Sequence, residues 1–423
     1  MRRWIKLDGY VLLTLAVGAC GGRSYGQASS IYEPVATGFQ VPRVAGTLNT
    51  SISASESIVR GYNGSSGAVY FTNVSGNVGY ISQSVAHPFS MIYGGGYLFS
   101  TTSQPSSFFH SLALSQVLNL RRWNFVIADD VAYLPQTPVG GFSGVAGLGV
   151  LGIAPTQPGG GNGLQSNYGP QVTNTVSGSV IRLLTPRTSV AGNGLFDLIR
   201  FPSSVNGIET TGERGGATLT HHTDARTTLT GQYDFNRLQY PQYGLTFHAH
   251  TLLFGASRQW TQNWITSAGA GPLFTTDLSG RSSVNYSVNG KAAYDTPRYK
   301  SDISFIRAVS SGSGVTTASV SNHASAFASR QIGLFTNLSL SLSYNHLQTL
   351  PSKLILDYST SNVIGNAQFT RAISRKLSAY VSYSGQHQTV NQSTFFVNAL
   401  QGTTQTFAFG LTYSPRPILI GSQ

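Results

Sequence analysis

Residues 338–345 read Leu-Ser-Leu-Ser-Leu-Ser-Tyr-Asn, so apolar and small polar side chains alternate at every position. Successive side chains of a strand point to opposite faces, and the pattern therefore predicts a sheet with one apolar and one polar surface. The same alternation returns along most of the chain, with turns about every 37 residues. In a closed barrel that sits in lipid, the apolar surface is the outer one. We predict an all-β, transmembrane, antiparallel up-and-down β-barrel.

The composition agrees with a barrel in lipid. Hydrophobic residues make up 40% of the chain, charged residues only 9%, and 48 of its 423 residues are glycine. Soluble domains are usually about a quarter charged. After the first 20 residues, no run reaches the roughly 18 to 20 apolar residues that a membrane helix needs.

The N-terminus has the pattern of an export signal. Arg2, Arg3 and Lys6 precede a short apolar run, and cleavage after Ala28 is favoured, which makes residues 1–28 a signal peptide. Cleavage before Cys20 is the alternative, because the four residues 17–20 are similar to a lipoprotein box, and Cys20 would then carry a lipid. Cys20 is the only cysteine, so an intramolecular disulfide is excluded.

The turn spacing predicts about 18 strands, within a range of 16 to 18. Each step of about 35 to 38 residues holds two long strands, one tight turn and one longer loop, which is the hairpin unit of a barrel. The barrel is expected over residues 44–413, after a short periplasmic segment at 29–43 and before a C-terminal tail at 414–423. The tight turns are predicted near residues 86–88, 121–122, 185–187, 223–225, 260–262, 296–298, 332–333 and 374–375.

The polar positions of the strands are the candidate lining of a pore. His248 and His250 share one strand face, but two ligands do not make a metal site, so polar lining is favoured over metal binding. No cofactor is expected. The candidate pore-lining residues are Asp234, Lys291, His248, His250, Gln232, Asn285 and Asn289.

The last strand, expected at Gly402–Tyr413, resembles the closing strand of Gram-negative outer-membrane barrels. The assembly signal of that class has a glycine, alternate apolar residues and a terminal aromatic, and the matching residues here are Phe407, Phe409, Gly410, Leu411 and Tyr413. The resemblance implies an outer-membrane location and recognition by the barrel-assembly machinery. It departs from the pattern in one respect, because the chain continues past Tyr413 to Gln423.

The positive charge of the chain gathers at the tight turns. The formal charge is +12, and removal of residues 1–28 leaves +9. This distribution does not indicate nucleic acid as a partner, because the basic residues are not clustered in an arm. Two interpretations stay open: a collar that contacts anionic lipid headgroups, which is favoured, or a ring at the periplasmic mouth of a pore that selects anions. The candidate ring is Arg122, Arg187, Arg226, Arg258, Arg298, Arg330, Arg371 and Arg375.

Residues 135–169 form the one long excursion between expected strands. The segment is rich in glycine and has an apolar centre, and loops of this length are usually functional or disordered. It is similar in position and length to the constriction loop of general porins, which narrows the lumen. A surface loop is the alternative.

His221, His222 and Asp224 are the nearest approach to a catalytic group. Neighbouring histidines of a strand face opposite sides, and no nucleophile can be placed beside them, so we predict that the protein is not an enzyme.

The leading prediction for function is a channel that passes small polar or anionic solutes through a water-filled barrel in the outer membrane of a Gram-negative bacterium. One alternative is a secretion conduit for an exopolysaccharide, since 18-stranded exporters of this kind are similar in strand count and charge. The other is a non-conducting barrel with a structural or adhesive role. The sequence leaves the oligomeric state open.

Overall fold

The computed structural model describes residues 46–61, 67–82, 84, 87–100, 106–134, 170–202, 207–277, 282–311, 317–350, 359–391 and 401–419. The predicted signal peptide, Cys20, the segment 29–43 and the long loop 135–169 lie outside these residues. Among the described residues, no helix has the length and apolarity to cross a membrane.

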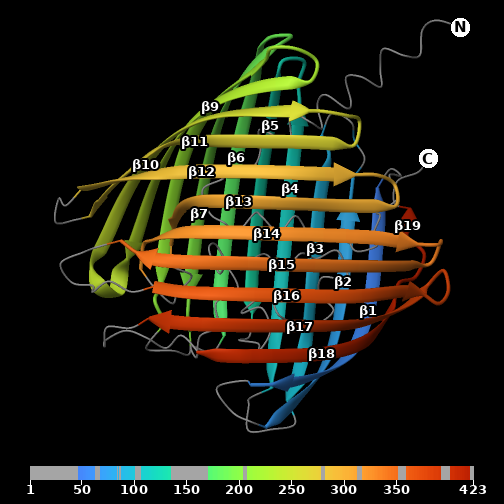
Figure 1. The fold of residues 1–423 in the computed structure, drawn as a ribbon. Helices are drawn as coiled ribbons and strands as arrows, with labels where there is room; N and C mark the ends of the chain where they lie inside the picture. Colours follow the sequence, from blue (N-terminus) through green and yellow to red (C-terminus); the bar gives the residue numbers. More distant parts are fainter. Residues whose placement is uncertain are drawn as a thin grey trace, which may run out of the picture.

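Eighteen long antiparallel strands form one closed sheet, and the predicted strand number is confirmed (Figure 1). Every strand pairs with its neighbours in sequence, and β1 pairs with β18 to close the barrel. In Figure 1 the strands of one wall, including β12 to β17, run across those of the opposite wall, including β2 to β7, as tilted barrel strands must. The first nine strands are β1 (Thr47–Arg60), β2 (Ala68–Ile81), β3 (Phe89–Ser100), β4 (Ser107–Asn119), β5 (Trp123–Leu134), β6 (Gln171–Thr185), β7 (Thr188–Arg200), β8 (Thr210–His222) and β9 (Thr227–Tyr240).

The second half of the sheet follows a short 3-10 turn, η5 (Pro241–Tyr243). Its strands are β10 (Leu245–Gln259), β11 (Trp264–Asp277), β12 (Ser282–Asp295), β13 (Tyr299–Ser310), β14 (Ser319–Ile332), β15 (Thr336–Thr349), β16 (Ser359–Ala372), β17 (Leu377–Asn391) and β18 (Gly402–Tyr413). The short connections occur at all eight predicted positions, and we call that side of the barrel the turn end and the opposite side the loop end.

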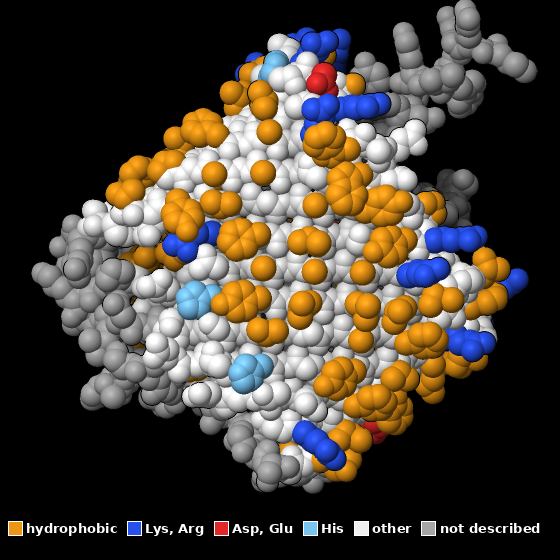
Figure 2. All heavy atoms as spheres, viewed as in Figure 1, with side chains coloured by type: hydrophobic (Ala, Val, Ile, Leu, Met, Phe, Trp, Pro, Cys, Tyr) orange, Lys and Arg blue, Asp and Glu red, His pale blue; other side chains and the backbone are white. Residues whose placement is uncertain are grey.

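Alternation along each strand separates two environments. On β15, Leu340 and Leu342 are 47% and 55% exposed on the outside, whereas Ser339 and Ser343 are 7% and 6% exposed on the inside. Figure 2 shows the hydrophobic side chains spread over the outer surface of one wall. Because an apolar outer belt around a closed sheet suits hydrocarbon, the predicted orientation of the faces is confirmed.

The chain beyond Tyr413 extends the seam of the barrel. Strand β18 pairs with β1 as far as Ile52, and the two residues of β19 (Ile418–Leu419) then pair with Thr47 and Leu48 at the start of β1. The segment between them contains Pro415 and Pro417, which cannot donate ladder hydrogen bonds. The residues after Tyr413, which the closing strands of the resembled class lack, therefore extend the pairing with β1.

Candidate functional site: the barrel interior

The middle of the inner wall is a network of small polar side chains. The hydroxyls of Ser53 and Ser75 lie 2.6 Å apart across β1 and β2, and the Ser321 hydroxyl donates to Asn345 Oδ1 at 2.9 Å across β14 and β15. Other inward groups, such as Asn345 Nδ2 and Asn77 Oδ1, have no hydrogen-bond partner among the described residues. Buried polar groups are nearly always hydrogen-bonded to protein or water, so this wall is suited to contact with water.

A cavity of about 110 Å³ opens into this wall across β9 to β13. Gly255 and Gly269 are cross-strand partners that face inward, and without side chains they form a depression beside Thr230 and Asn289. A Cβ atom at Gly269 would lie 2.6 Å from Asn289 Oδ1, so only glycine leaves room for that amide. The polar groups of the cavity are mostly hydroxyls and amides, among them those of Thr230, Gln232 and Asn289, which can exchange hydrogen bonds with a polar solute.

One ion pair borders the cavity. Lys291 Nζ on β12 lies 3.5 Å from Asp302 Oδ2 on β13, with side chains 28% and 18% exposed. Both residues line the cavity. The pair therefore offers a donor and an acceptor of opposite charge to a solute at one place on the wall.

A second charged group lies on the inner faces of β7, β8 and β9. Arg214 is 7% exposed and interacts electrostatically with Asp197 and Asp234, which are 1% and 4% exposed. Its Nε donates to Asn236 Oδ1. Each carboxylate lies over a glycine two residues from the arginine. At Gly212 a Cβ atom would overlap with Asp197 Oδ1, so a side chain there would displace that carboxylate.

Gly216 leaves space for the second carboxylate, because a Cβ atom there would overlap with Asp234 Oδ1. The pattern Gly-x-Arg-x-Gly thus makes room for a carboxylate on each side of a buried guanidinium. Our sequence analysis did not identify Arg214 or Asp197, although a charged residue between glycines of the same strand parity was a usable signal.

Near the loop end, the part of the interior between β8 and β15 carries a cluster of apolar residues. Tyr240 and Phe247, which face inward, pack with Leu273 and with residues from β13 and β14. The full cluster is Ile208, Leu238, Tyr240, Leu245, Phe247, Ala249, Leu273, Val309, Ala318, Val320 and Leu350. A layer of this kind resists water, and it occupies part of the interior near the loop end.

The described end of the β13–β14 hairpin contributes to this cluster with residues whose strand parity predicts an outward position. Val309 has the outward parity of Ile303 and Phe305, yet it is 5% exposed and packs in the interior cluster. Ser311 and Ala318 are fully buried, and the Tyr240 hydroxyl donates to the Ser311 carbonyl at 2.9 Å. The hairpin end is therefore turned inward against β9 to β11.

A shortened ladder permits this inward turn. Strands β12 and β13 pair over residues 288–295 and 300–307, whereas β13 pairs with β14 along its whole length. Where the β12–β13 ladder stops, side chains replace it: Arg307 Nε donates to the Tyr286 carbonyl at 3.2 Å, and the Ser287 hydroxyl donates to the Arg307 carbonyl at 2.8 Å. The backbone acceptors that the split releases are thereby satisfied.

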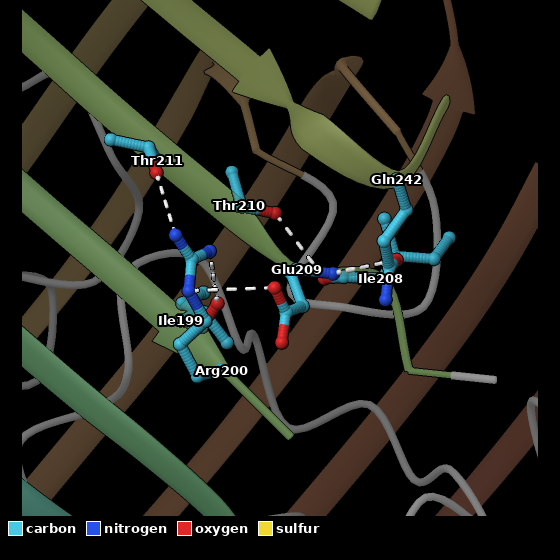
Figure 3. A network of polar contacts seen from close by, with 7 residues as sticks. All are labelled: Ile199, Arg200, Ile208, Glu209, Thr210, Thr211 and Gln242. Atoms are coloured by element: carbon cyan, nitrogen blue, oxygen red, sulfur yellow. Dashed lines mark hydrogen bonds and ion pairs between the residues drawn. The ribbon is translucent and has the colours of Figure 1, made fainter. Parts of the chain in front are cut away.

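A polar network holds the rim between β7, β8 and η5 (Figure 3). Arg200 Nε lies 3.4 Å from Glu209 Oε2, and the Glu209 backbone N–H donates to Gln242 Oε1 at 3.2 Å. The adjacent residue Ile208 is part of the apolar cluster. The network therefore connects the apolar cluster to the rim of the barrel between β7, β8 and η5.

Five of the candidate pore-lining residues lie on the inner face. Gln232, Asn289 and Lys291 come together at the cavity. Asp234 is in the group around Arg214, and Asn285 has the inward parity of Asn289 on the same strand. Whether they line a conducting pore is a proposal that we take up below.

The prediction for His248 and His250 is wrong. Both share the parity of Leu252 and Phe254, which are 38% and 62% exposed on the outside. His250 Nδ1 lies 2.8 Å from the Tyr233 hydroxyl on the outer face, and its ring lies near that of Phe235. The prediction relied on the polar character of the two histidines, whereas the face of a strand residue is set by its position in the alternation.

The candidate basic ring lies at the turn end of the barrel, as its sequence positions imply. Arg258 stacks over the Trp260 ring at 4.6 Å, and Arg330 is the cross-strand partner of Tyr299 and Leu338 on the outer face. Arg371 has the outward parity of Phe369, and the other five members lie in the exposed tight turns. This placement favours the interpretation as a lipid collar.

His221, His222 and Asp224 do not form one group in the structure. His221 faces outward and contacts the Thr188 hydroxyl at 3.0 Å, whereas His222 contacts Thr228 at 2.9 Å. Asp224 accepts the backbone N–H of Arg226 at 2.6 Å, and this hydrogen bond lowers the pKa of the carboxyl group below its usual value. Asp224 therefore shapes the turn. No group of three metal-ligand side chains occurs in the part of the chain that the structure describes.

A closed antiparallel sheet with an apolar outside and a polar inside spans a membrane without an unpaired edge. The chain is a transmembrane β-barrel. No protein-family model and no curated protein matches it. Among solved structures, OccK9 (OpdG) of Pseudomonas aeruginosa is 11% identical, with 88% of this chain and 98% of that chain covered and a TM-score of 0.45.

Two further Pseudomonas aeruginosa structures are similar in the same way. OccK2 (OpdF), solved in complex with glucuronate, is 11% identical over 87% of this chain and 97% of its own, with a TM-score of 0.43. OpdK, solved with vanillate, is 10% identical over 87% of this chain and 98% of its own, with a TM-score of 0.42. The barrel fold of the present chain is established by its own strand pairing.

Proposed function

We propose that the protein is a channel that lets small polar solutes cross the outer membrane. The observation that carries the proposal is the inner wall, where hydroxyl and amide side chains cover the middle of a closed barrel of 18 long strands. Barrels of 16 to 18 strands are wide enough to hold water. The solute is expected to pass the cavity on β9 to β13, where Gln232, Asn289 and Lys291 provide polar contacts.

The charge of the inner wall limits the class of solute. Although the whole chain is basic, the charged residues with inward parity on the described strands include both signs: Arg214, Lys291, Lys300, Asp130, Asp197, Asp234, Asp295 and Asp302. This mixture does not provide the basic path that an acidic polysaccharide needs, so small solutes are favoured over polymer secretion. Lys291 is the contact that we assign to an anionic solute. The proposal assigns no catalytic role to the chain.

The wild-type protein is expected to conduct in planar lipid bilayers. Because the apolar layer occupies part of the interior, we expect single-channel steps well below those of an open barrel of this size, and uptake of small neutral sugars by proteoliposomes. The measurement is single-channel recording of purified, refolded protein. Complete absence of steps, together with impermeable proteoliposomes, would contradict the channel and favour a structural barrel.

Replacing Tyr240 with phenylalanine is expected to increase conductance. The change removes the hydrogen bond that holds Ser311, which contributes about 1 kcal/mol, and so favours displacement of the hairpin end from the interior. The expected result is an approximately fivefold increase in the ratio of high to low conductance levels. Tyr344→Phe on the outer face is the control and should behave like the wild type. Equal records for both variants would exclude this hairpin end as the narrowing element.

A further inference from the structure

Four strands each carry an outward-facing histidine near the loop end. His110 on β4, His250 on β10, His346 on β15 and His387 on β17 are each a few residues from the loop end of their strand. In every case Nδ1 is 2.8 Å from a hydroxyl on an adjacent strand, which leaves Nε2 for another partner. Figure 2 shows histidines of this kind on the outer surface, toward the loop end.

On β13 to β16 the polar positions form a continuous row. Arg307, Asn322, His346 and Ser361 are successive cross-strand partners. The Arg307 guanidinium donates to Asn322 Oδ1 at 2.7 Å and lies 4.4 Å from the centre of the Tyr286 ring. The row is therefore ordered by its own contacts before any ligand arrives. We call these four residues the loop-end row.

Among the described residues, the loop-end row carries positive charge with no acidic neighbour on its face. The described acidic residues of β13 to β18 are limited to Asp302, which faces inward and pairs with Lys291. The described partners of the Arg307 side chain are the Tyr286 carbonyl, the Tyr286 ring and Asn322, none of which is charged. No carboxylate of the described residues therefore neutralises its charge, which favours an anionic ligand.

The height of the row matches the headgroup level of the membrane. On β15, the outward residues between Thr336 and His346 are Leu338, Leu340, Leu342 and Tyr344. Ten residue steps of about 3.3 Å at a tilt near 40° span about 25 Å, which is the height of the apolar band of such barrels. The loop-end row thus lies where hydrocarbon ends in the external leaflet.

We propose that the loop-end row binds the phosphate group of a lipid in the outer leaflet. Arg307 supplies a guanidinium that is not paired with a carboxylate, and His346 supplies its Nε2. The apolar band below the row, with Leu342 and Tyr344, contacts the acyl chains of the same molecule. The proposal concerns the outer surface, and it does not depend on conduction through the barrel.

The test uses lipid A as the probe. Native mass spectrometry of the folded protein in detergent is expected to show saturable binding of lipid A. Arg307→Gln and His346→Gln should each weaken binding about fivefold, the effect expected from the loss of one charged contact or one hydrogen bond at the surface. Arg60→Gln, which changes an exposed arginine at the loop end of β1 that belongs neither to the loop-end row nor to the basic ring, should bind like the wild type.

Two further arms identify what is recognised. Lipid A without its phosphates should bind weakly, and equal binding would overturn the proposal in favour of acyl-chain contact. Inorganic phosphate at millimolar concentration should not displace the lipid, and full displacement would assign the row to a free anion instead. Since Arg307 also completes the β12–β13 ladder, folding of each variant is checked by the electrophoretic shift between heated and unheated samples. His346→Gln with unchanged affinity would exclude the site.

Discussion

Replacing Gly410 with valine is expected to prevent closure of the barrel. Gly410 lies on the inner face of β18, next to the seam, with Tyr380 of β17 and Ser55 of β1 as its cross-strand partners. The Tyr380 ring, 2% exposed, covers the glycine, and a Cβ would meet that ring at 2.5 Å and Ser55 Cβ at 2.8 Å. The ring would have to leave a site that joins three strands.

The expected cost is about 3 kcal/mol, the upper part of the range for overpacking of an interior. The measurement is the fraction of protein that migrates as a compact folded band without heating, and we expect that fraction to be small. Gly192→Val is the matched control, because a Cβ at Gly192 meets nothing within 4 Å and valine favours strands. If the overlap with Tyr380 is the cause, Gly410→Val/Tyr380→Ala should fold better than Gly410→Val alone. A folded single variant would contradict this account.

The strand faces could be predicted from the sequence because each strand has hydrocarbon on one side and polar groups on the other. Gln232 and Asp234 were predicted to face inward, and the structure places them there, with Leu229 and Tyr233 of the same strand on the outside. Counting alternate positions from Leu252 and Phe254 would have put His248 and His250 outside. Both parities are apolar around Leu253, so the phase of that strand was ambiguous until its register with β9 was known.

The inward turn of the β13–β14 hairpin could not be predicted. Val309 and Val320 are as apolar as residues that face lipid, and a sequence does not distinguish hydrocarbon from a protein interior. The distinction depends on where the β12–β13 ladder ends, and that depends on contacts between distant strands, such as that of Tyr240 with Ser311. The long loop 135–169, for which a constriction loop and a surface loop were both open, lies outside the described residues, so that prediction stays untested.

Replacing Arg214 with methionine is expected to destabilise the barrel strongly. The change leaves Asp197 and Asp234, at 1% and 4% exposure, without the positive charge between them. Removal of one partner from a buried ionic group typically costs 3 to 5 kcal/mol, and we expect about 3 kcal/mol because lumen water can reach part of this group. Guanidinium unfolding in detergent, followed by tryptophan fluorescence, measures the loss.

Arg237→Met is the matched control for this prediction. Arg237 is on the neighbouring strand and faces outward, with a side chain 41% exposed that lies 3.3 Å from Glu213, and an exposed pair of this kind contributes at most about 1 kcal/mol. The triple variant Asp197→Asn/Arg214→Met/Asp234→Asn should recover most of the stability, because it removes the uncompensated charges as well. If the triple variant is as unstable as Arg214→Met, packing of the arginine, and not its charge, holds β7, β8 and β9 together. Because the carboxylates face the interior, Arg214→Met should also shift ion selectivity toward cations in those molecules that fold.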